Sequence, residues 1–389
     1  MCKVKVNEFS VGWGPAIWKK QGKETLYALR IIPLGGYVNL EGEDFESKDE
    51  HSYRNASIPK RIAIILAGPA VNIIFALVTY FILMAVISNN SSLVVKELMH
   101  EYSAEVSGIQ INDEITKING KRIYIKSDLD KALEECNGEE LVVSVKRDDE
   151  ELDIKITPTK IDYRYTGIYL RSIEIGESTK VITVEPNSVA ERSGIKPNDE
   201  IIKINGIEVN NQTEILNLIN NIEDATIDIT IKRGNEEFVI NIEPQINSYY
   251  YLGVYFEKAE NTFTNNIYYA FFDTKEFVIS IFQNLKMLFT GNARINQFVG
   301  PVGISQVVIN TNKVEDFVNI LALVSLSLGV TNLLPIPALD GGKFVLLLIE
   351  AIRRKKIDEK IEMSMSLISF ALLIILSVYV TYNDILRIL

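Results

Sequence analysis

The chain has 389 residues, 47% of them hydrophobic and 23% charged, and its net charge of −11 argues against a nucleic-acid partner. Its two cysteines, Cys2 and Cys136, are too few and too far apart for a disulfide framework or a cysteine-rich metal site. The mean hydropathy is only +0.11, because apolar residues are concentrated towards the two ends of the sequence. This composition is typical of a membrane protein with a large polar insertion.

Three uncharged segments are long enough to cross a hydrocarbon core of about 30 Å as helices. They are residues 62–87, 317–339 and 363–383. Lys60 and Arg61 precede the first segment, and a basic run, 353–356, lies between the second and the third. Because cytoplasmic loops carry the excess of Lys and Arg, we expect residues 1–60 and 343–362 in the cytoplasm and the polar insertion outside.

The polar insertion contains a duplication. Residues 104–120 match residues 190–206 at 13 of 17 positions, with an offset of 86. Such self-similarity indicates two copies of one supersecondary unit. In each copy a short helix ends at a glycine, and the strand that follows closes on Asn-Gly. That pair suits a type I′ turn because both residues tolerate positive φ.

Each copy continues with a predicted helix, over 126–135 and 212–221, and then with two alternating strands. The shared core, Gly-Ile-x-x-Asn-Asp-Glu-Ile-x-Lys-Ile-Asn-Gly, resembles that of PDZ domains. We therefore expect two α+β PDZ-like domains, 91–160 and 161–247, each able to fold alone. PDZ domains take an extended peptide as an added strand and can hold its terminal carboxylate. Spacers or steric filters without a ligand are the alternative.

A single acidic residue, Asp340, ends the second uncharged segment within the run Asn332-Leu-Leu-Pro-Ile-Pro-Ala-Leu-Asp340-Gly-Gly342. A carboxylate at membrane depth costs roughly 2.5–3.5 kcal/mol on insertion scales, so we expect it to have a partner. The two prolines and two glycines predict a broken helix with freed backbone polar groups. A metal bound at the bend would account for Asp340, the break and the nearby Asn332 together. An aspartate that caps a helix at the bilayer surface is the alternative.

Further motifs lie at both ends of the chain. They are Phe9-Ser-Val-Gly-Trp-Gly-Pro15, Pro33-Leu-Gly-Gly-Tyr-Val38, Ala67-Gly-Pro-Ala-Val-Asn72 and Gly300-Pro-Val-Gly-Ile304. With the Asn332–Gly342 run, the most specific of the set, they cover essentially the whole chain. Together they resemble the bacterial site-2 protease family, intramembrane zinc metalloproteases of the regulator-of-sigma-E type.

This resemblance, with the three apolar segments, implies a multi-pass α-helical protein of the inner membrane. It implies a membrane-associated β-hairpin region on the cytoplasmic side and two extracytoplasmic α+β PDZ-like domains inserted between membrane helices. The expected boundaries are 1–60 for the hairpin region, 61–90, 317–345 and 363–389 for the membrane segments, 248–316 for a linker with amphipathic segments and the Gly-Pro-Val-Gly-Ile motif, and 346–362 for a basic cytoplasmic loop.

The resemblance also implies roles for single residues. Asp340 would be a zinc ligand, and Asn332 would donate a hydrogen bond near the scissile carbonyl. Gly12, Trp13 and Gly14 would hold the substrate as an extra strand, and glycine fits there because a second backbone must approach closely. An ordinary hairpin turn at these glycines is the alternative. The implied partners are the lipid bilayer and transmembrane substrates such as anti-sigma factors or signal-peptide remnants, with no nucleic acid.

The sequence departs from the family at one motif. The family takes two zinc ligands and its general base from His-Glu-x-x-His on its first membrane helix. The only histidines here are His51 and His100, and neither stands in such a motif. As written, the chain is expected not to assemble the zinc site. Two function classes stay open: an intramembrane zinc endopeptidase whose chain is truncated at the N-terminus, or a catalytically inactive, membrane-anchored PDZ scaffold or pseudoprotease.

We predict that the in-frame DNA before the Met1 codon encodes a hydrophobic helix that carries His-Glu-x-x-His within about 15 residues of it. The motif must end near the cytoplasmic face, and a helix rises only about 1.5 Å per residue. Sequencing that region tests the prediction. A stop codon directly upstream, with a ribosome-binding site placed for Met1, would favour the scaffold.

Overall fold

The computed structural model describes residues 2–43, 49–87, 90–170, 179–185, 187–290, 299–309, 311, 313–355 and 357–388. Lys356, part of the predicted basic run, lies outside the described residues. The chain forms two compact units. One comprises residues 1–80, 274–287 and 308–379, and the other residues 81–273, 288–307 and 380–389.

Three helices are long and apolar enough to cross a membrane: α1 (Ile58–Ile87), α8 (Val314–Asn332) and α10 (Glu359–Ile388). They contain most of the three segments predicted from the sequence. The predicted break in the second segment is confirmed, because α8 ends at Asn332 and a new helix, α9 (Asp340–Arg353), begins at Asp340. Pro335 and Pro337 explain the break, since proline lacks the N–H that a continuing helix needs. Since α9 continues to Arg353, the first half of the expected loop 346–362 is helical.

The N-terminal region of the first unit is a sheet made from two bent strands, β1 (Val6–Gln21) and β2 (Leu26–Leu40), followed by the short helix η1 (Tyr53–Asn55). Residues 8–11 of β1 pair with residues 26–29 of β2 on one side and with residues 36–39 on the other. Residues 18–21 pair with the far side of 26–29. Two strands therefore form a sheet of four segments, with 8–11 and 26–29 inside.

The second unit contains the two repeats, with the elements that the duplication predicted. The first has β3 (Ser91–Leu98), α2 (Ser103–Ser107), β4 (Glu114–Ile118), β5 (Lys121–Arg122), α3 (Lys126–Glu135), β6 (Leu141–Arg147) and β7 (Glu150–Ile156). The second has β10 (Val181–Val184), α4 (Val189–Arg192), β11 (Glu200–Ile204), β12 (Ile207–Glu208), α5 (Gln212–Asn221), β13 (Ile227–Arg233) and β14 (Glu236–Ile242). Both Asn-Gly pairs have positive φ at each residue, which confirms the predicted turns.

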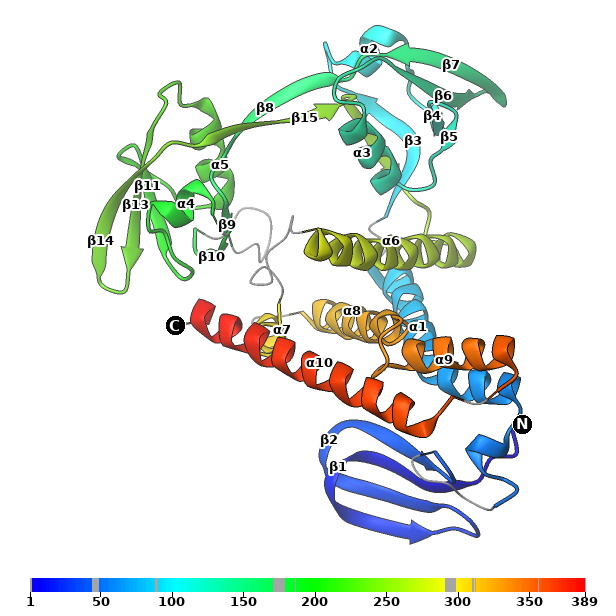
Figure 1. Ribbon diagram of the computed structural model, residues 1–389. Coiled ribbons are helices and arrows are strands. Elements are labelled where there is room, and N and C mark those ends of the chain that lie inside the picture. The colour runs from blue at the N-terminus through cyan, green and yellow to red at the C-terminus, as the bar shows by residue number, and fades with distance from the viewer. Residues whose placement is uncertain are drawn as a thin grey trace. The chain divides into compact units, whose positions relative to one another are not determined.

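The two repeats exchange their last strands. The first repeat continues into β8 (Thr159–Tyr165) and β9 (Ile168–Leu170), and the second into β15 (Gln245–Tyr251) and β16 (Val254–Lys258). β8 and β15 pair with each other along their whole length (Figure 1). Beyond this ribbon, β9 pairs with β10 of the second repeat, and β16 pairs with β3 of the first. Each sheet is thus completed by a strand that follows the other repeat.

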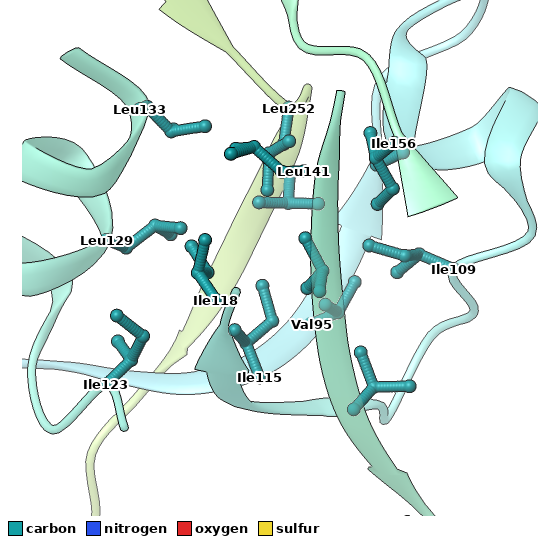
Figure 2. Packing of buried hydrophobic residues seen from close by; sticks show 14 residues of the cluster. Val95, Ile109, Ile115, Ile118, Ile123, Leu129, Leu133, Leu141, Ile156 and Leu252 are labelled. Atoms are coloured by element: carbon teal, nitrogen blue, oxygen red, sulfur yellow. The ribbon is translucent and has the colours of Figure 1, made fainter. Parts of the chain in front are cut away.

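This exchange corrects the expected boundaries. Residues 248–316 were assigned to a linker, but their first part completes the sheet and core of the first repeat. Leu252 and Val254 are buried in the same cluster as Val95, Ile115 and Leu141, and Figure 2 shows Leu252 among them. The duplication period could not reveal this, because exchanged and unexchanged strands give the same offset. After β16 the chain continues through α6 (Phe263–Phe289) and α7 (Pro301–Ile309).

We predict that Leu252→Ala destabilises an isolated 91–258 fragment by about 2–5 kcal/mol, because it empties a fully buried site in the first repeat. Urea unfolding of the fragment measures the change. Ile246→Ala is the matched control: Ile246 is on β15 but 71% exposed, and its removal should cost less than about 0.5 kcal/mol. Equal effects of the two substitutions would show that residues 252–258 do not belong to the first repeat.

Candidate functional site

The motif around Asp340 folds into a tight turn between α8 and α9. Asn332 is the last residue of α8, and Asp340 is the first residue of α9. Between them the backbone N–H of Leu334 donates to the Thr331 carbonyl at 3.0 Å, and that of Leu339 donates to the Ile336 carbonyl at 2.8 Å. The two polar residues that the sequence singled out therefore flank one turn.

The two glycines after Asp340 let α9 begin directly against this turn. A Cβ on Gly341 would overlap the Leu333 carbonyl, and a Cβ on Gly342 would overlap the Ile336 carbonyl. Both glycines are buried. Since no other residue fits so close to a backbone, Gly341 and Gly342 determine where Asp340 lies relative to the turn.

Helix α1 approaches the same turn through its Ala67–Asn72 motif. A Cβ on Gly329 of α8 would lie 3.0 Å from the Pro69 carbonyl oxygen, so the two helix backbones are nearly in contact. The Ser325 hydroxyl donates to the Asn72 carbonyl at 3.1 Å. Small residues that let backbones approach are the usual means of packing membrane helices.

The Asp340 carboxylate faces α1 at a position without a side chain. Its Oδ2 would lie 3.8 Å from a Cβ built on Gly68. Within the described part of the chain, Asp340 makes no hydrogen bond and no ion pair. The Asp340 carboxylate thus lies where α1, α8, the turn and α9 pack closely, and no group in the described residues donates to it. A carboxylate in such a position can accept a ligand.

Two ion pairs link α9, the helix that begins at Asp340, to neighbouring elements. The Arg61 guanidinium of α1 donates to both carboxylate oxygens of Glu350 on α9, at 2.6 and 3.2 Å, and both side chains are largely buried. Lys343 of α9 lies 3.2 Å from Glu43, which follows β2. α9 is thus linked to α1 and to the end of the N-terminal sheet region.

A cavity of about 240 Å³ lies beside these ion pairs. Arg61, Lys343 and Glu350 contribute polar walls, and Leu347 and Met363 are among the apolar ones. Tyr53 also lines it, and burial raises the pKa of its phenol above the ordinary value. The cavity is therefore lined by both positively and negatively charged side chains.

The predicted substrate loop, Gly12, Trp13 and Gly14, is the bend of β1. Gly12 and Gly14 have φ of 86° and 83°, a region that favours glycine. A Cβ on Gly12 would lie 2.6 Å from the Ile32 carbonyl oxygen. The backbone of Trp13 pairs with Ile32, and its side chain lies outside the described residues. In the described ranges no hydrogen bond joins this loop to Asn332 or Asp340, the two predicted residues that flank the turn.

One face of the N-terminal sheet is apolar and exposed. Paired residues of neighbouring strands share a face. The pairs Phe9–Tyr27, Phe9–Val38, Val11–Leu29 and Trp18–Leu29 therefore lie on one side, and these side chains are 44–52% exposed. The other face carries the buried residues Ser10 and Ala28.

The Gly300–Ile304 motif has a separate partner in the second unit. The carboxylate of Asp384, on α10, accepts hydrogen bonds from the backbone N–H groups of Gly300 at 3.1 Å and Gly303 at 2.9 Å. Asp384 is only 1% exposed. The motif therefore fixes the start of α7 against the end of α10, and it contributes no residue to the turn at Asp340.

The described residues include no group of three or more His, Cys, Asp or Glu side chains that could hold a metal ion. His100 lies 3.1 Å from Glu105 and is 85% exposed, and His51 lies 3.6 Å from Asp49. The present residues therefore do not fit a zinc ion by themselves, since a structural or catalytic zinc takes at least three protein ligands.

Sequence reasoning missed four residues that organise these sites: Gly68, Gly329, Glu350 and Asp384. Asp384 had a visible signal, because it directly follows the third uncharged segment as Asp340 follows the second. Gly68 stood in a quoted motif without an assigned contact. Gly329 and Glu350 carried no local signal, because their partners are far away in the sequence.

The sequence profile described as "Peptidase family M50" matches residues 1–376. The regulator of sigma-E protease RseP of Escherichia coli K12 is 28% identical over 98% of this chain and 92% of its own length. The regulator of sigma E protease of Haemophilus influenzae is 27% identical, covering 99% and 93%, and the zinc metalloprotease RasP of Oceanobacillus iheyensis is 27% identical, covering 98% and 92%. Among solved structures, the HtrA3 PDZ domain bound to a phage-derived ligand is 26% identical over 23% of this chain and 92% of its own, with a TM-score of 0.20.

We predict that Gly341→Ala lowers the stability of the purified protein by about 1–3 kcal/mol or more, because the new methyl group would overlap the turn backbone. Thermal unfolding in detergent measures it. Gly68→Ala is the matched control, since its nearest neighbour would be at the ordinary contact distance of 3.8 Å. If both variants unfold at the parent temperature, the close packing at Gly341 is wrong.

Proposed function

The chain belongs to peptidase family M50. We propose that it is an intramembrane endopeptidase that cuts the membrane anchors of other proteins. The observation that carries the proposal is Asp340. Its carboxylate is placed at the break between α8 and α9, opposite Gly68 of α1, and it has no partner in the described part of the chain. A scaffold has no need of such a group at membrane depth.

The other predicted residues take roles around Asp340. Asn332, at the opposite end of the turn, would donate its amide N–H to the scissile carbonyl as negative charge develops there. The Gly12–Gly14 loop would hold an unwound substrate segment as an added strand, since main-chain hydrogen bonding can bind an extended peptide without regard to its sequence. The exposed apolar face with Phe9, Trp18 and Tyr27 would rest on the bilayer, because aromatic side chains favour the membrane interface.

Zinc is the metal that the family implies, and this sequence does not complete a site for it. Asp340 would supply one carboxylate ligand, which suits zinc beside two imidazoles. The 389 residues contain no His-Glu-x-x-His motif, and the two histidines present, His51 and His100, stand outside any such motif. We therefore assign no reaction step through the metal to these residues.

The repeats would select substrates. The basic run after α9 would place Asp340 near the cytoplasmic face of the inner membrane and the repeats outside it. At that distance the repeats supply neither a ligand nor a base, and they would instead restrict which membrane proteins reach the site. The names of two relatives connect them with the regulation of sigma E. We accordingly propose anti-sigma factors or signal-peptide remnants as the substrate class.

A second function, an inactive membrane-anchored PDZ scaffold, is favoured by the absence of His-Glu-x-x-His and by the sheets of the repeats. In the described residues β16 and β9 are edge strands of their sheets. An edge strand can accept an extended peptide as its neighbour. The scaffold would bind outer segments of membrane proteins without cutting them.

Cleavage of a membrane-anchored reporter distinguishes the two functions. The gene would be expressed from Met1 and, in parallel, with its in-frame upstream sequence. We expect cleavage and one zinc per chain only in the second case, and we expect Asp340→Ala to abolish cleavage. Asp316→Ala is the matched control, because this exposed acid precedes the same uncharged segment at its other end. Retained cleavage by Asp340→Ala, or stoichiometric zinc in the 389-residue chain, would contradict the proposal.

The same reporter tests the role of the repeats. Deleting residues 91–258 should leave cleavage intact and extend it to reporters that keep a bulky outer domain, because the restriction on access is gone. A variant that inserts stably but no longer cuts any reporter would mean that the repeats take part in the reaction itself.

A further inference from the structure

The Arg30 side chain of β2 donates hydrogen bonds to four groups from both strands of the N-terminal sheet. Its Nε donates to the Ser10 hydroxyl at 2.8 Å. Its two terminal nitrogens donate to the Glu8 carboxylate at 2.5 Å, to the Tyr37 hydroxyl at 2.8 Å and to the Gly14 carbonyl at 2.5 Å. The Tyr37 hydroxyl in turn donates to Glu8 at 2.9 Å. Arginine suits this site because its planar fork offers several fixed donors at once.

The bond to Gly14 lies where the two strands lose their regular pairing. Trp13 pairs with Ile32, and the next recorded pair is Ala16 with Arg30. Gly14, between them, has a positive φ and no ladder partner. Gly14 is exposed, so water competes for this carbonyl, and only a charged donor held in place by other groups would fix its position. The Arg30 guanidinium is that donor.

The other three partners fix the guanidinium itself. Glu8 and Ser10 lie on the inner segment of the sheet, and Tyr37 lies on the edge segment beside it. The Arg30 hydrogen bond lowers the pKa of the Glu8 carboxyl, so this partner is charged at neutral pH. Ser10 is 1% exposed, on the face opposite Phe9 and Val11. The cluster thus supports the bend from the face that is turned away from the exposed apolar side chains.

We propose that Arg30 is the positioning residue of the Gly12–Gly14 loop: it sets the loop's shape through the Gly14 carbonyl and does not itself touch the substrate. This inference rests on the proposed function, in which that loop holds an extended substrate segment. With Arg30 in place, the loop is formed before the substrate arrives, so binding does not have to order it.

The test uses the full-length protein in membranes, with a photo-crosslinking amino acid in place of Ile17, which is 67% exposed on the neighbouring edge segment. The probe is the membrane-anchored reporter, and its crosslink yield reports binding without requiring cleavage. Arg30→Met should lower the yield at least tenfold. Arg30→Lys, which keeps the charge but not the fork, should lower it several-fold. Lys20→Met removes an exposed cation from the same sheet and should leave the yield unchanged.

Hydrogen exchange of the amides at residues 12–16 provides the second readout. Arg30→Met should accelerate it at least tenfold while exchange in 26–29 stays slow, which shows that the sheet is still folded. A crosslink yield and an exchange rate equal to the parent's would overturn the positioning role. If the parent itself forms no crosslink, the substrate role of the loop fails, and the exchange rates still decide whether Arg30 holds it.

Discussion

The close approach of backbones around one turn is the constraint on which the first unit depends. Gly329 allows α8 to approach α1, and Gly341 and Gly342 allow α9 to begin against the turn that ends α8. A Cβ on Gly341 or Gly342 would overlap backbone atoms, so no side-chain rearrangement can replace these two glycines. The position of Asp340 follows from these contacts, because it is the residue between the turn and the glycine pair. Helices that pack through small residues gain dispersion contacts over their whole backbone, which is the main attraction available inside a bilayer.

The second unit depends on a different feature, the two-stranded antiparallel ribbon of β8 and β15, which connects the two repeats. The second repeat with β9 is continuous in the chain, whereas the first repeat needs β16, which follows the second repeat, to complete its core. The ribbon leads directly into Gly167 and Gly253, the residues before β9 and β16, and both have positive φ. In the described residues those strands are the edges of their sheets.

Much of this organisation could be predicted from the sequence, and the exceptions share a cause. Local patterns gave the bounds of α3 and α5 and the Asn-Gly turns, since helix periodicity and turn chemistry are properties of neighbouring residues. They also placed Asn332 and Asp340 in a broken helix. The strand exchange, the Arg61–Glu350 pair and the Arg30 cluster were not predicted. Each is a contact between residues distant in sequence, and a single sequence with a fixed repeat offset contains no information on which strand pairs with which.

Asp340 and Asp384 occupy similar positions in the sequence pattern but have different surroundings in the structure. Each is an acid at the C-terminal end of a long uncharged stretch, and each lies at the start of a helix that has glycine in or next to its first turn. Asp384 accepts two backbone N–H groups at the start of α7, so its charge is compensated within the chain. Asp340 is of intermediate exposure, faces Gly68 of α1, and makes no hydrogen bond or ion pair in the described residues. The difference assigns a structural role to Asp384, and it supports the proposal that Asp340 is a ligand-binding group.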